Sequence, residues 1–411
     1  MTALVAAGAL ANLVLALVLL RDPARAADLQ IVYDWCSRWL RLGEDLYATL
    51  SSSTDYPPNA IATLSPLSLI PQSLLVPVWA SITLALTFVF AFLVVRVTDP
   101  RATRDTAALP VLLFLCWGGV RMLLQFTRLT ITLAYAAIRS ADTAPVASGI
   151  LLGLALAKPQ IAGPIALWML VTKRWRPLAV ASVVVVLCAA VYMICAGASP
   201  AAVATGYLNI LRDLYADPTA LVGRTSIRRW AYVFAGDSVT ADLMWAVAAA
   251  ILLAIPCRAA IAQTRVGDQR AAAAVPALFC LWSLLVWFHL GNNFVLMFPA
   301  FAFLLLVDDP ETRGERMFVA AAMQLPLMLD VPVHLLGYVP RLGPFGFLVV
   351  DADRFVAIGA FFYLANLAAR LNTRGLDVNA TQVVHSGDSG NNGGYHTNPL
   401  PLEGPPNEIS W

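Results

Sequence analysis

Apolar stretches separated by short polar connections run through almost the whole chain, and their number is the first indication of its architecture. About 12 of them can be recognised, at 3–20, 76–95, 107–120, 127–139, 144–157, 160–172, 177–196, 241–256, 273–290, 293–307, 317–330 and 346–370. A helix needs about 20 apolar residues to cross a bilayer, but shorter helices are tolerated where neighbours shield them. The pattern therefore predicts an all-α polytopic membrane protein with about 12 transmembrane helices.

Two segments near the N-terminus affect how the chain is threaded through the membrane. A cleaved signal peptide is the alternative for residues 3–20, but no basic residue precedes this stretch, which favours a retained first helix. Residues 57–75 contain four prolines, and we expect a short or re-entrant element there. A full span at this point would reverse the sidedness of every later helix.

Basic residues indicate the side of each connection, because short cytoplasmic loops are enriched in arginine and lysine. Short basic connections occur at 96–104, 173–176, 258–270, 313–316 and 370–374. With the N-terminus inside, all of these are cytoplasmic, and the long connections 21–56 and 198–240 lie outside. We expect one transmembrane domain over 1–371 and a disordered cytoplasmic tail over 372–411, which has too little apolar surface to order itself.

The composition supports a membrane protein and excludes several classes of function. Hydrophobic residues make up 59% of the 411 residues and charged residues 13%, whereas soluble domains carry about 25% charged residues. This composition indicates the lipid bilayer as a partner, and a net charge of only +2 implies no nucleic acid. The six cysteines show no ligand spacing, so no metal site, disulfide framework or cofactor is expected.

The first outer connection contains an amphipathic pattern that begins near Asp28. Leu29, Val32 and Trp39 share one face of a predicted helix that lies at the membrane interface and ends at Gly43. Asp28 is interpreted either as an N-cap carboxylate, worth about 1 kcal/mol, or as a general base at the membrane surface. The local sequence favours the cap, and the two roles are compatible.

Two basic residues lie in or beside apolar segments. Lys158 precedes Pro159 within the apolar residues 144–172, and an ionisable group at membrane depth indicates a functional site. A lysine that snorkels to the interface is the alternative. Arg128 lies beside an outer link, where its planar guanidinium suits a phosphate and where interfacial anchoring explains it equally well.

Further polar residues lie at the outer ends of apolar segments. His289 precedes Asn292, so a polar pocket and a packed histidine are both consistent with the sequence. Asp55 and Tyr56 precede two prolines, which mark a helix start, and these two residues are candidates to face a substrate. A carboxylate near cationic groups at the lipid–water boundary indicates acid–base chemistry on an anionic lipid phosphate, or transport of such a lipid.

Six short motifs occur along residues 10–310 in a characteristic order and spacing. They are DLQIVY (28–33), GEDLY (43–47), YPP (56–58), GLALAKPQ (153–160), KRWR (173–176) and WFH (287–289). Together they resemble glycosyltransferase family 87, polytopic GT-C enzymes that use polyprenyl-phosphate sugars as donors. The chain departs from the family at 127–130, where TRLT replaces the frequent pattern Gly-Gln-x-Asn/Thr.

The resemblance implies a role for each candidate residue. Asp28 matches the catalytic base, and Lys158 and His289 match positions near the donor phosphate. We place Arg128 at the same phosphate because of its planar guanidinium. Substrate contacts are expected from Tyr33, Asp55, Tyr56 and Asn292. The aromatic residues of the outer connection 198–240 are candidates to bind the acceptor, and an aromatic belt at the membrane interface is the alternative. They are Tyr207, Tyr215, Trp230 and Tyr232.

The implied activity is transfer of a hexose, mannose by family analogy, from a polyprenyl-phosphate donor to an envelope glycolipid or glycan. We expect an inverting single displacement at the outer face of the plasma membrane, without a metal or cofactor. A transporter or flippase of a lipid-linked sugar is the alternative, since it needs the same basic groups but no base at Asp28. A non-catalytic membrane scaffold is the third possibility.

Overall fold

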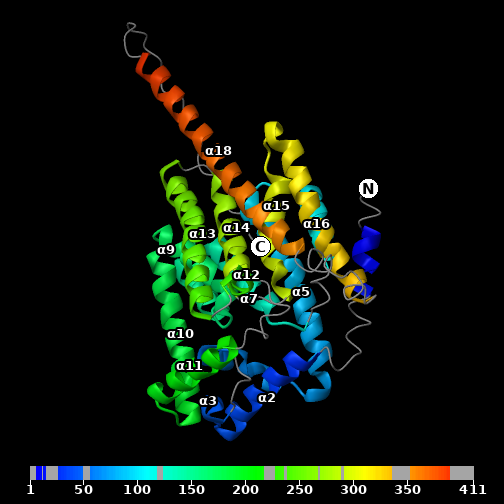
Figure 1. Ribbon diagram of the computed structural model, residues 1–411, viewed down its shortest axis with the longest axis vertical. Coiled ribbons are helices and arrows are strands. Elements are labelled where there is room, and N and C mark those ends of the chain that lie inside the picture. Colours follow the sequence, from blue (N-terminus) through cyan, green and yellow to red (C-terminus); the bar gives the residue numbers. More distant parts are fainter. Residues whose placement is uncertain are drawn as a thin grey trace, which may run out of the picture.

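The computed structural model describes residues 6–11, 13–14, 26–49, 56–117, 124–216, 227–235, 238–266, 269–287, 291–335 and 352–388. All elements in these ranges are helices, as the sequence predicts (Figure 1). They form a tall helical bundle with a smaller layer of helices across one end, which we call the cap. The predicted all-α class is therefore confirmed for the part of the chain that is described.

Four helices in the described ranges are long and apolar enough to cross a membrane. They are α5 (Gln72–Thr98), α10 (Trp175–Ala196), α13 (Ser238–Val266) and α18 (Ala352–Asp388). A fifth span results if Asn293–Leu306 and Pro310–Gln324, which meet at 113°, are counted as one broken helix. The number of about 12 spans therefore stays a prediction, although most of the predicted apolar stretches are helical.

Shorter helices pack between the long ones and make up the interior of the bundle. They are α6 (Arg104–Leu115), α7 (Thr127–Ser140), α8 (Pro145–Ala155), α9 (Pro159–Val171), α14 (Gln269–Val286), α15 (Phe298–Leu306) and α16 (Arg313–Leu335). The described side chains of α14 and α15 are almost all buried, so the bundle is organised around these two helices. Helices buried on all sides have no polar face, which explains why hydrophobicity alone located them.

Helices α8 and α10 approach each other closely at two glycines. A Cβ added to Gly149 would lie 2.5 Å from Val180 Cβ, and one added to Gly153 would lie 2.6 Å from Val184 Cβ. Glycines four residues apart let the backbones of membrane helices pack closely. The glycine of the GLALAKPQ motif is thus explained by packing of α8 on α10.

Replacing Gly153 with alanine is expected to lower the melting temperature of the purified protein. The new methyl group would force α8 away from α10, and overpacking of this kind costs roughly 1–3 kcal/mol. Gly163→Ala in α9 is the matched control, because none of the described atoms lies within 4 Å of its added Cβ. Equal melting temperatures for the two variants would contradict the close packing at Gly153.

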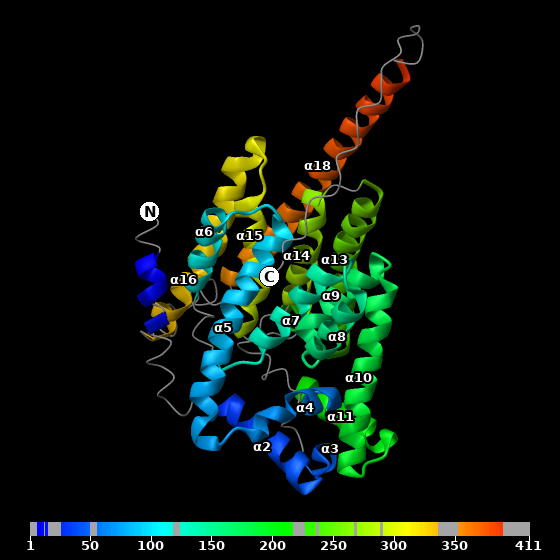
Figure 2. The same cartoon turned by 180° about the vertical axis from the view of Figure 1, so that it is seen from behind.

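The cap is formed by residues from two distant parts of the chain (Figure 2). Its elements are α2 (Ala27–Leu42), α3 (Leu46–Thr49), α4 (Pro58–Leu64), the 3₁₀ helix η2 (Ser65–Leu69) and α11 (Pro200–Ala216). Helix α4 has 7 residues, so it is far too short to cross a bilayer. The predicted short element at 57–75 is confirmed up to Leu69, after which α5 begins at Gln72.

Helix α2 has the amphipathic form that the sequence predicts. It ends at Gly43, which adopts a left-handed conformation with φ 65°. Across this turn Arg38 donates hydrogen bonds to Glu44, which lowers the pKa of the Glu44 carboxyl. The buried face of α2 packs on the end of α10, where Trp39 stacks on Tyr192 at a ring-centroid distance of 5.6 Å.

The outer connection 198–240 is divided between the cap and the bundle. In the cap, α11 lies against α3, and Tyr207 meets Tyr47 edge-on at 5.8 Å. The second helix of this connection, α12 (Ile227–Ala235), packs on α13. The aromatic residues predicted to bind one acceptor therefore lie on two separate helices, α11 in the cap and α12 beside α13. Tyr215 belongs to α11, but its side chain is outside the description.

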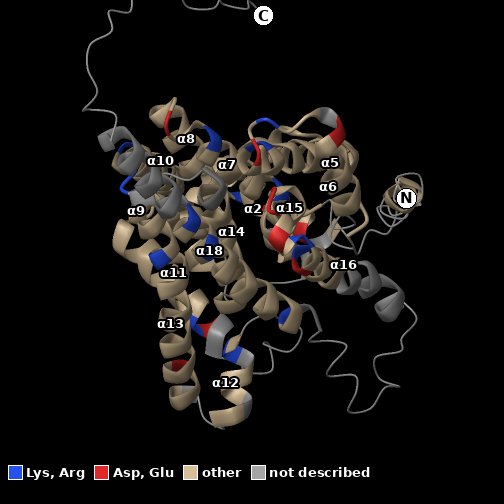
Figure 3. Ribbon diagram, turned by 90° about the horizontal axis from the view of Figure 1, so that it is seen from above, with Lys and Arg blue, Asp and Glu red and all other residues tan. Residues whose placement is uncertain are grey.

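Charged residues gather beside α15 and α16 at the end of the bundle opposite the cap (Figure 3). Arg374 of α18 pairs there with Asp309, at 3.0 Å, and with Glu311. Helix α18 continues to Asp388, so the prediction of a disordered tail from residue 372 is wrong for 372–388. The ion pairs of Arg374 and the absence of proline from this stretch explain the longer helix, and residues 389–411 lie outside the description.

Candidate functional site

Asp28 lies in the first turn of α2 with its side chain exposed on the cap. The N-cap residue is Ala26, and no side chain caps the helix. The interpretation of Asp28 as the N-cap is therefore wrong, although its charge still favours the N-terminal end of the helix dipole. Its carboxylate accepts a hydrogen bond from the side-chain amide of Gln125, 97 positions away.

Lys158 points into the protein at the junction of α8 and α9. Its residue is 7% exposed, and its Nζ donates to Thr127 Oγ1 at 2.9 Å. Thr127 Oγ1 in turn donates to Asn293 Oδ1 at 3.0 Å. The snorkelling alternative is wrong, because a snorkelling lysine would extend its ammonium towards water. A chain of three polar side chains instead joins α9, α7 and the 3₁₀ helix η5 (Gly291–Met297).

The segment 125–127 connects the two residues that the sequence singled out. Gln125 binds Asp28, and Thr127 binds Lys158. Two residues span at most about 7 Å of chain, so this short segment holds the cap carboxylate and the buried ammonium in one region of the molecule. Gln125 and Thr127 had no sequence signal of their own, apart from the departure from the family pattern that begins at residue 127.

Arg128 is 2% exposed, and its guanidinium lies 5.2 Å from the centre of the Phe114 ring. The interfacial-anchor interpretation is wrong, because the side chain is enclosed by the bundle. Cation–π attraction stabilises a guanidinium in such a place. Since Arg128 follows Thr127 directly, it adds positive charge to the region of Lys158.

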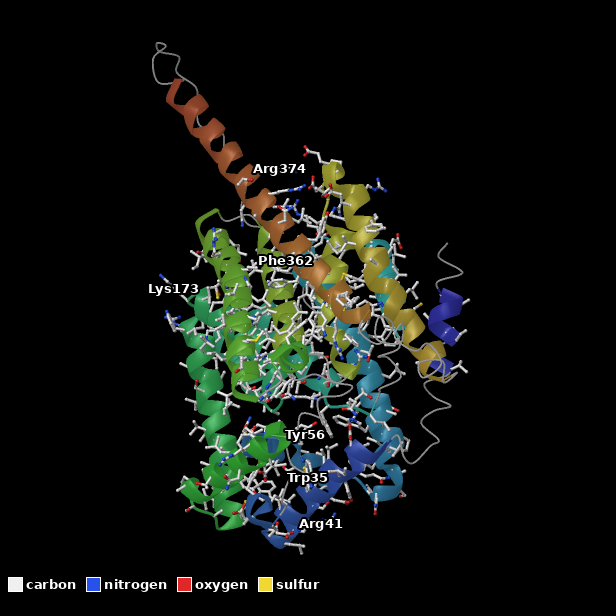
Figure 4. All side chains as sticks on the ribbon, in the orientation of Figure 1. Trp35, Arg41, Tyr56, Lys173, Phe362 and Arg374 are labelled. Carbon is white, nitrogen blue, oxygen red and sulfur yellow. The ribbon has the colours of Figure 1, made fainter. Side chains whose placement is uncertain are left out.

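Tyr56 lies where the cap meets the bundle (Figure 4). Its ring packs edge-on against Trp35 of α2, at 6.3 Å, and against Phe126, at 6.2 Å. Three residues further on, Asn59 donates to the carbonyl of Leu156 at 3.3 Å, two positions before Lys158. Tyr56 and Asn59 thus join the cap to the segment 125–127 and to the link between α8 and α9, which contains Lys158.

Not every predicted site residue reaches this region within the described structure. Tyr33 is buried in α2 and contributes to the apolar core of the cap. Asp55 and His289 lie outside the described residues, as does the side chain of Asn292. Among the described residues, no three His, Cys, Asp or Glu side chains come together as metal ligands.

A family model describes residues 54–287, which is more than half of the chain, as glycosyltransferase family 87. The chain belongs to glycosyltransferase family 87. No curated protein and no solved structure matches it. Family membership together with the long apolar helices makes this protein a membrane glycosyltransferase.

The matched region divides the candidate residues into two groups. Tyr56, Arg128 and Lys158 lie within it, as do Gln125 and Thr127. Asp28 and Tyr33 precede the matched region, and His289 and Asn292 follow it. The region that carries the family likeness therefore contains the Lys158 chain of hydrogen bonds, apart from Asn293.

Proposed function

We propose that this family 87 glycosyltransferase transfers a hexose from a polyprenyl-phosphate donor to an envelope glycolipid or glycan, and that the hexose is mannose. The reaction takes place at the outer face of the plasma membrane. The observation that carries the proposal is the segment 125–127, which ties an exposed carboxylate at Asp28 to a buried ammonium at Lys158. A base and a phosphate-binding cation on either side of one segment fit transfer from a lipid phosphate.

In the proposed reaction Asp28 takes the proton from the attacking acceptor hydroxyl. The acceptor oxygen forms a bond to the anomeric carbon as the bond from that carbon to the phosphate oxygen breaks on the opposite face, with inversion. The electron pair of the broken bond stays on the polyprenyl phosphate. Because this leaving group is already a stable anion, no acid is needed to protonate it.

Gln125 is assigned a positioning role, because its side-chain amide donates to one oxygen of the Asp28 carboxylate. This hydrogen bond fixes the orientation of the carboxylate and so the direction of its remaining lone pairs. Lys158 is assigned to the charge that develops on the leaving phosphate. A preorganised cation in a site that excludes water stabilises such charge more strongly than it would in water. Arg128 and His289 are proposed to contribute further positive charge or donors to the same phosphate.

Tyr33, Asp55, Tyr56 and Asn292 remain proposed substrate contacts. Of these, Tyr56 is supported by its half-buried place between Trp35 and Phe126, beside the residue that binds Asp28. The apolar helices of the bundle are assigned to the polyprenyl chain, which needs no polar partner.

The test is transfer by the purified full-length protein in liposomes. Radiolabelled polyprenyl-phosphate mannose is supplied with a membrane glycolipid extract, and the glucose analogue is supplied in parallel. We expect label on the acceptor, with the anomeric configuration opposite to that of the donor. Retained configuration would contradict the single displacement.

A transporter of lipid-linked sugars is the second candidate, because Lys158 and Arg128 would serve a bound phosphate equally well. It predicts that the labelled lipid crosses the bilayer of the liposome and that no label reaches an acceptor. If every polyprenyl-phosphate sugar crosses the bilayer and none labels an acceptor, the transporter explains the protein and the transferase proposal is overturned.

A further inference from the structure

The KRWR motif (173–176) has no part in the proposed reaction, and it forms the turn between α9 and α10. Three of its four side chains are exposed, namely Lys173, Trp175 and Arg176. Trp175 is 58% exposed and begins a helix that is long and apolar enough to cross a membrane. Lys173 projects from the periphery of the bundle (Figure 4). An exposed tryptophan at the end of a spanning helix is typical of the lipid–water interface.

The fourth side chain of the motif, Arg174, holds the turn in one conformation. Its guanidinium donates to both carboxylate oxygens of Asp142, at 3.0 and 2.9 Å, and to Thr172 Oγ1 at 2.8 Å. It also lies 4.4 Å from the centre of the Trp168 ring. Lys173 has φ 60° and is the one described residue other than glycine in the left-handed region. Such a conformation persists only where the surrounding contacts impose it, so the turn presents its other three side chains in a fixed way.

The exposed side chains give this turn a net positive charge. The charge of Arg174 is balanced by Asp142. Lys173 and Arg176 take part in none of the ion pairs between described residues. Three residues of chain span at most about 11 Å, so both cations can act on the same ligand. Two close cations with no described carboxylate to balance them favour an anion.

An exposed apolar stripe continues from Arg176 along α10. Helix α8 packs on a different face of α10, through Gly149 and Gly153. The residues of the stripe follow Arg176 at helical spacing and are all exposed: Ala179, Val183, Val186 and Leu187. From Arg176 to Leu187 the helix rises about 16 Å, close to half of the roughly 30 Å hydrocarbon thickness. The stripe therefore matches the length of an acyl chain in one leaflet.

We propose that the KRWR turn and this stripe bind one anionic phospholipid of the bilayer. Its phosphate lies at Lys173 and Arg176, Trp175 lies at the level of the glycerol esters, and an acyl chain follows the stripe. Our sequence-based topology places the turn on the cytoplasmic side, where the anionic leaflet surface attracts basic segments.

This lipid is a bound component of the membrane and not a substrate. Helix α9, with 13 residues, separates the turn from Lys158 by about 20 Å along the chain. The lipid site therefore goes beyond the proposed function and does not depend on it. Its loss is expected to leave hexose transfer unchanged.

The experiment titrates the purified full-length protein in detergent with phosphatidylglycerol or with neutral phosphatidylcholine and measures the Kd of the first bound lipid by native mass spectrometry. For the wild type we expect phosphatidylglycerol to bind at least tenfold more tightly. The double variant Lys173→Met/Arg176→Gln should raise the Kd for phosphatidylglycerol at least tenfold and leave that for phosphatidylcholine unchanged. Trp175→Ala should weaken binding of both lipids a few-fold, because the indole contacts the uncharged part.

The matched control is Arg101→Gln/Arg258→Gln, which removes two exposed charges from other predicted cytoplasmic connections. It changes the net charge equally and should keep the wild-type Kd. Equal Kd values for phosphatidylglycerol in the two double variants would overturn the proposal, as would equal binding of the two lipids by the wild type. Displacement of phosphatidylglycerol by millimolar inorganic phosphate would also contradict it, because the turn would then bind a free anion.

A melting curve of each variant checks the fold. If Lys173→Met/Arg176→Gln does not fold, Arg176→Gln decides in its place, with Arg258→Gln as its control. None of these measurements uses hexose transfer, so the lipid site and the proposed function stand or fall separately.

Discussion

Asp28→Asn is expected to reduce the kcat of hexose transfer by about 10²- to 10⁴-fold, the range that general-base catalysis supplies. The asparagine side chain has the same shape and keeps an oxygen that accepts from Gln125. It cannot take a proton at neutral pH. Folding and donor KM should therefore stay close to those of the wild type, and the loss should appear in kcat.

The matched control is Asp34→Asn, which makes the same change at an exposed position of the same helix. We expect wild-type kcat for this variant. Initial rates with saturating donor and acceptor provide the measurement, and a melting curve of each variant checks the fold. An Asp28→Asn enzyme with the kcat of the Asp34→Asn enzyme would sink the assignment of the base.

Lys158→Met is expected to lower kcat/KM for the donor by about 10²- to 10³-fold, as for loss of one preorganised donor to developing charge. Methionine keeps the length and apolar stem of the side chain but removes the ammonium. Because methionine fills the same buried space and has no charge to desolvate, the melting temperature should change little. Thr127 keeps its hydrogen bond to Asn293 in this variant.

The chain offers a control for this change, because it contains only two lysines. Lys173 is exposed at the periphery of the bundle (Figure 4). The Lys173→Met variant should transfer hexose at the wild-type rate. Thr127→Ser should also be nearly normal, whereas Thr127→Val should lose about tenfold through the misplaced ammonium. Normal kcat/KM in Lys158→Met would remove this residue from the donor site.

The apolar stretches were predictable because burial in helices is a local property of the sequence. A run such as 177–196 can satisfy its backbone only within itself, so the helix α10 follows from composition and length. The end of α2 was equally local, since Gly43 adopts the left-handed conformation at no steric cost. Scarcity of charge at membrane depth also made Lys158 conspicuous before any contact was known.

The partners of those residues could not be predicted in the same way. Gln125 meets Asp28 across 97 positions, and Thr127 meets Asn293 across 166. Such pairs form only when helices from distant parts of the chain pack side by side.

The sequence by itself determined an all-helical membrane protein and the place of most helices, and it singled out Asp28 and Lys158 as candidate site residues. These depend on hydrophobic periodicity, helix-ending glycine and the cost of burying charge, all of which act over a few neighbouring residues. Only the tertiary structure decided that the segment 125–127 joins Asp28 to Lys158. This contact depends on which helix faces pack together, and that choice is made by the whole chain at once.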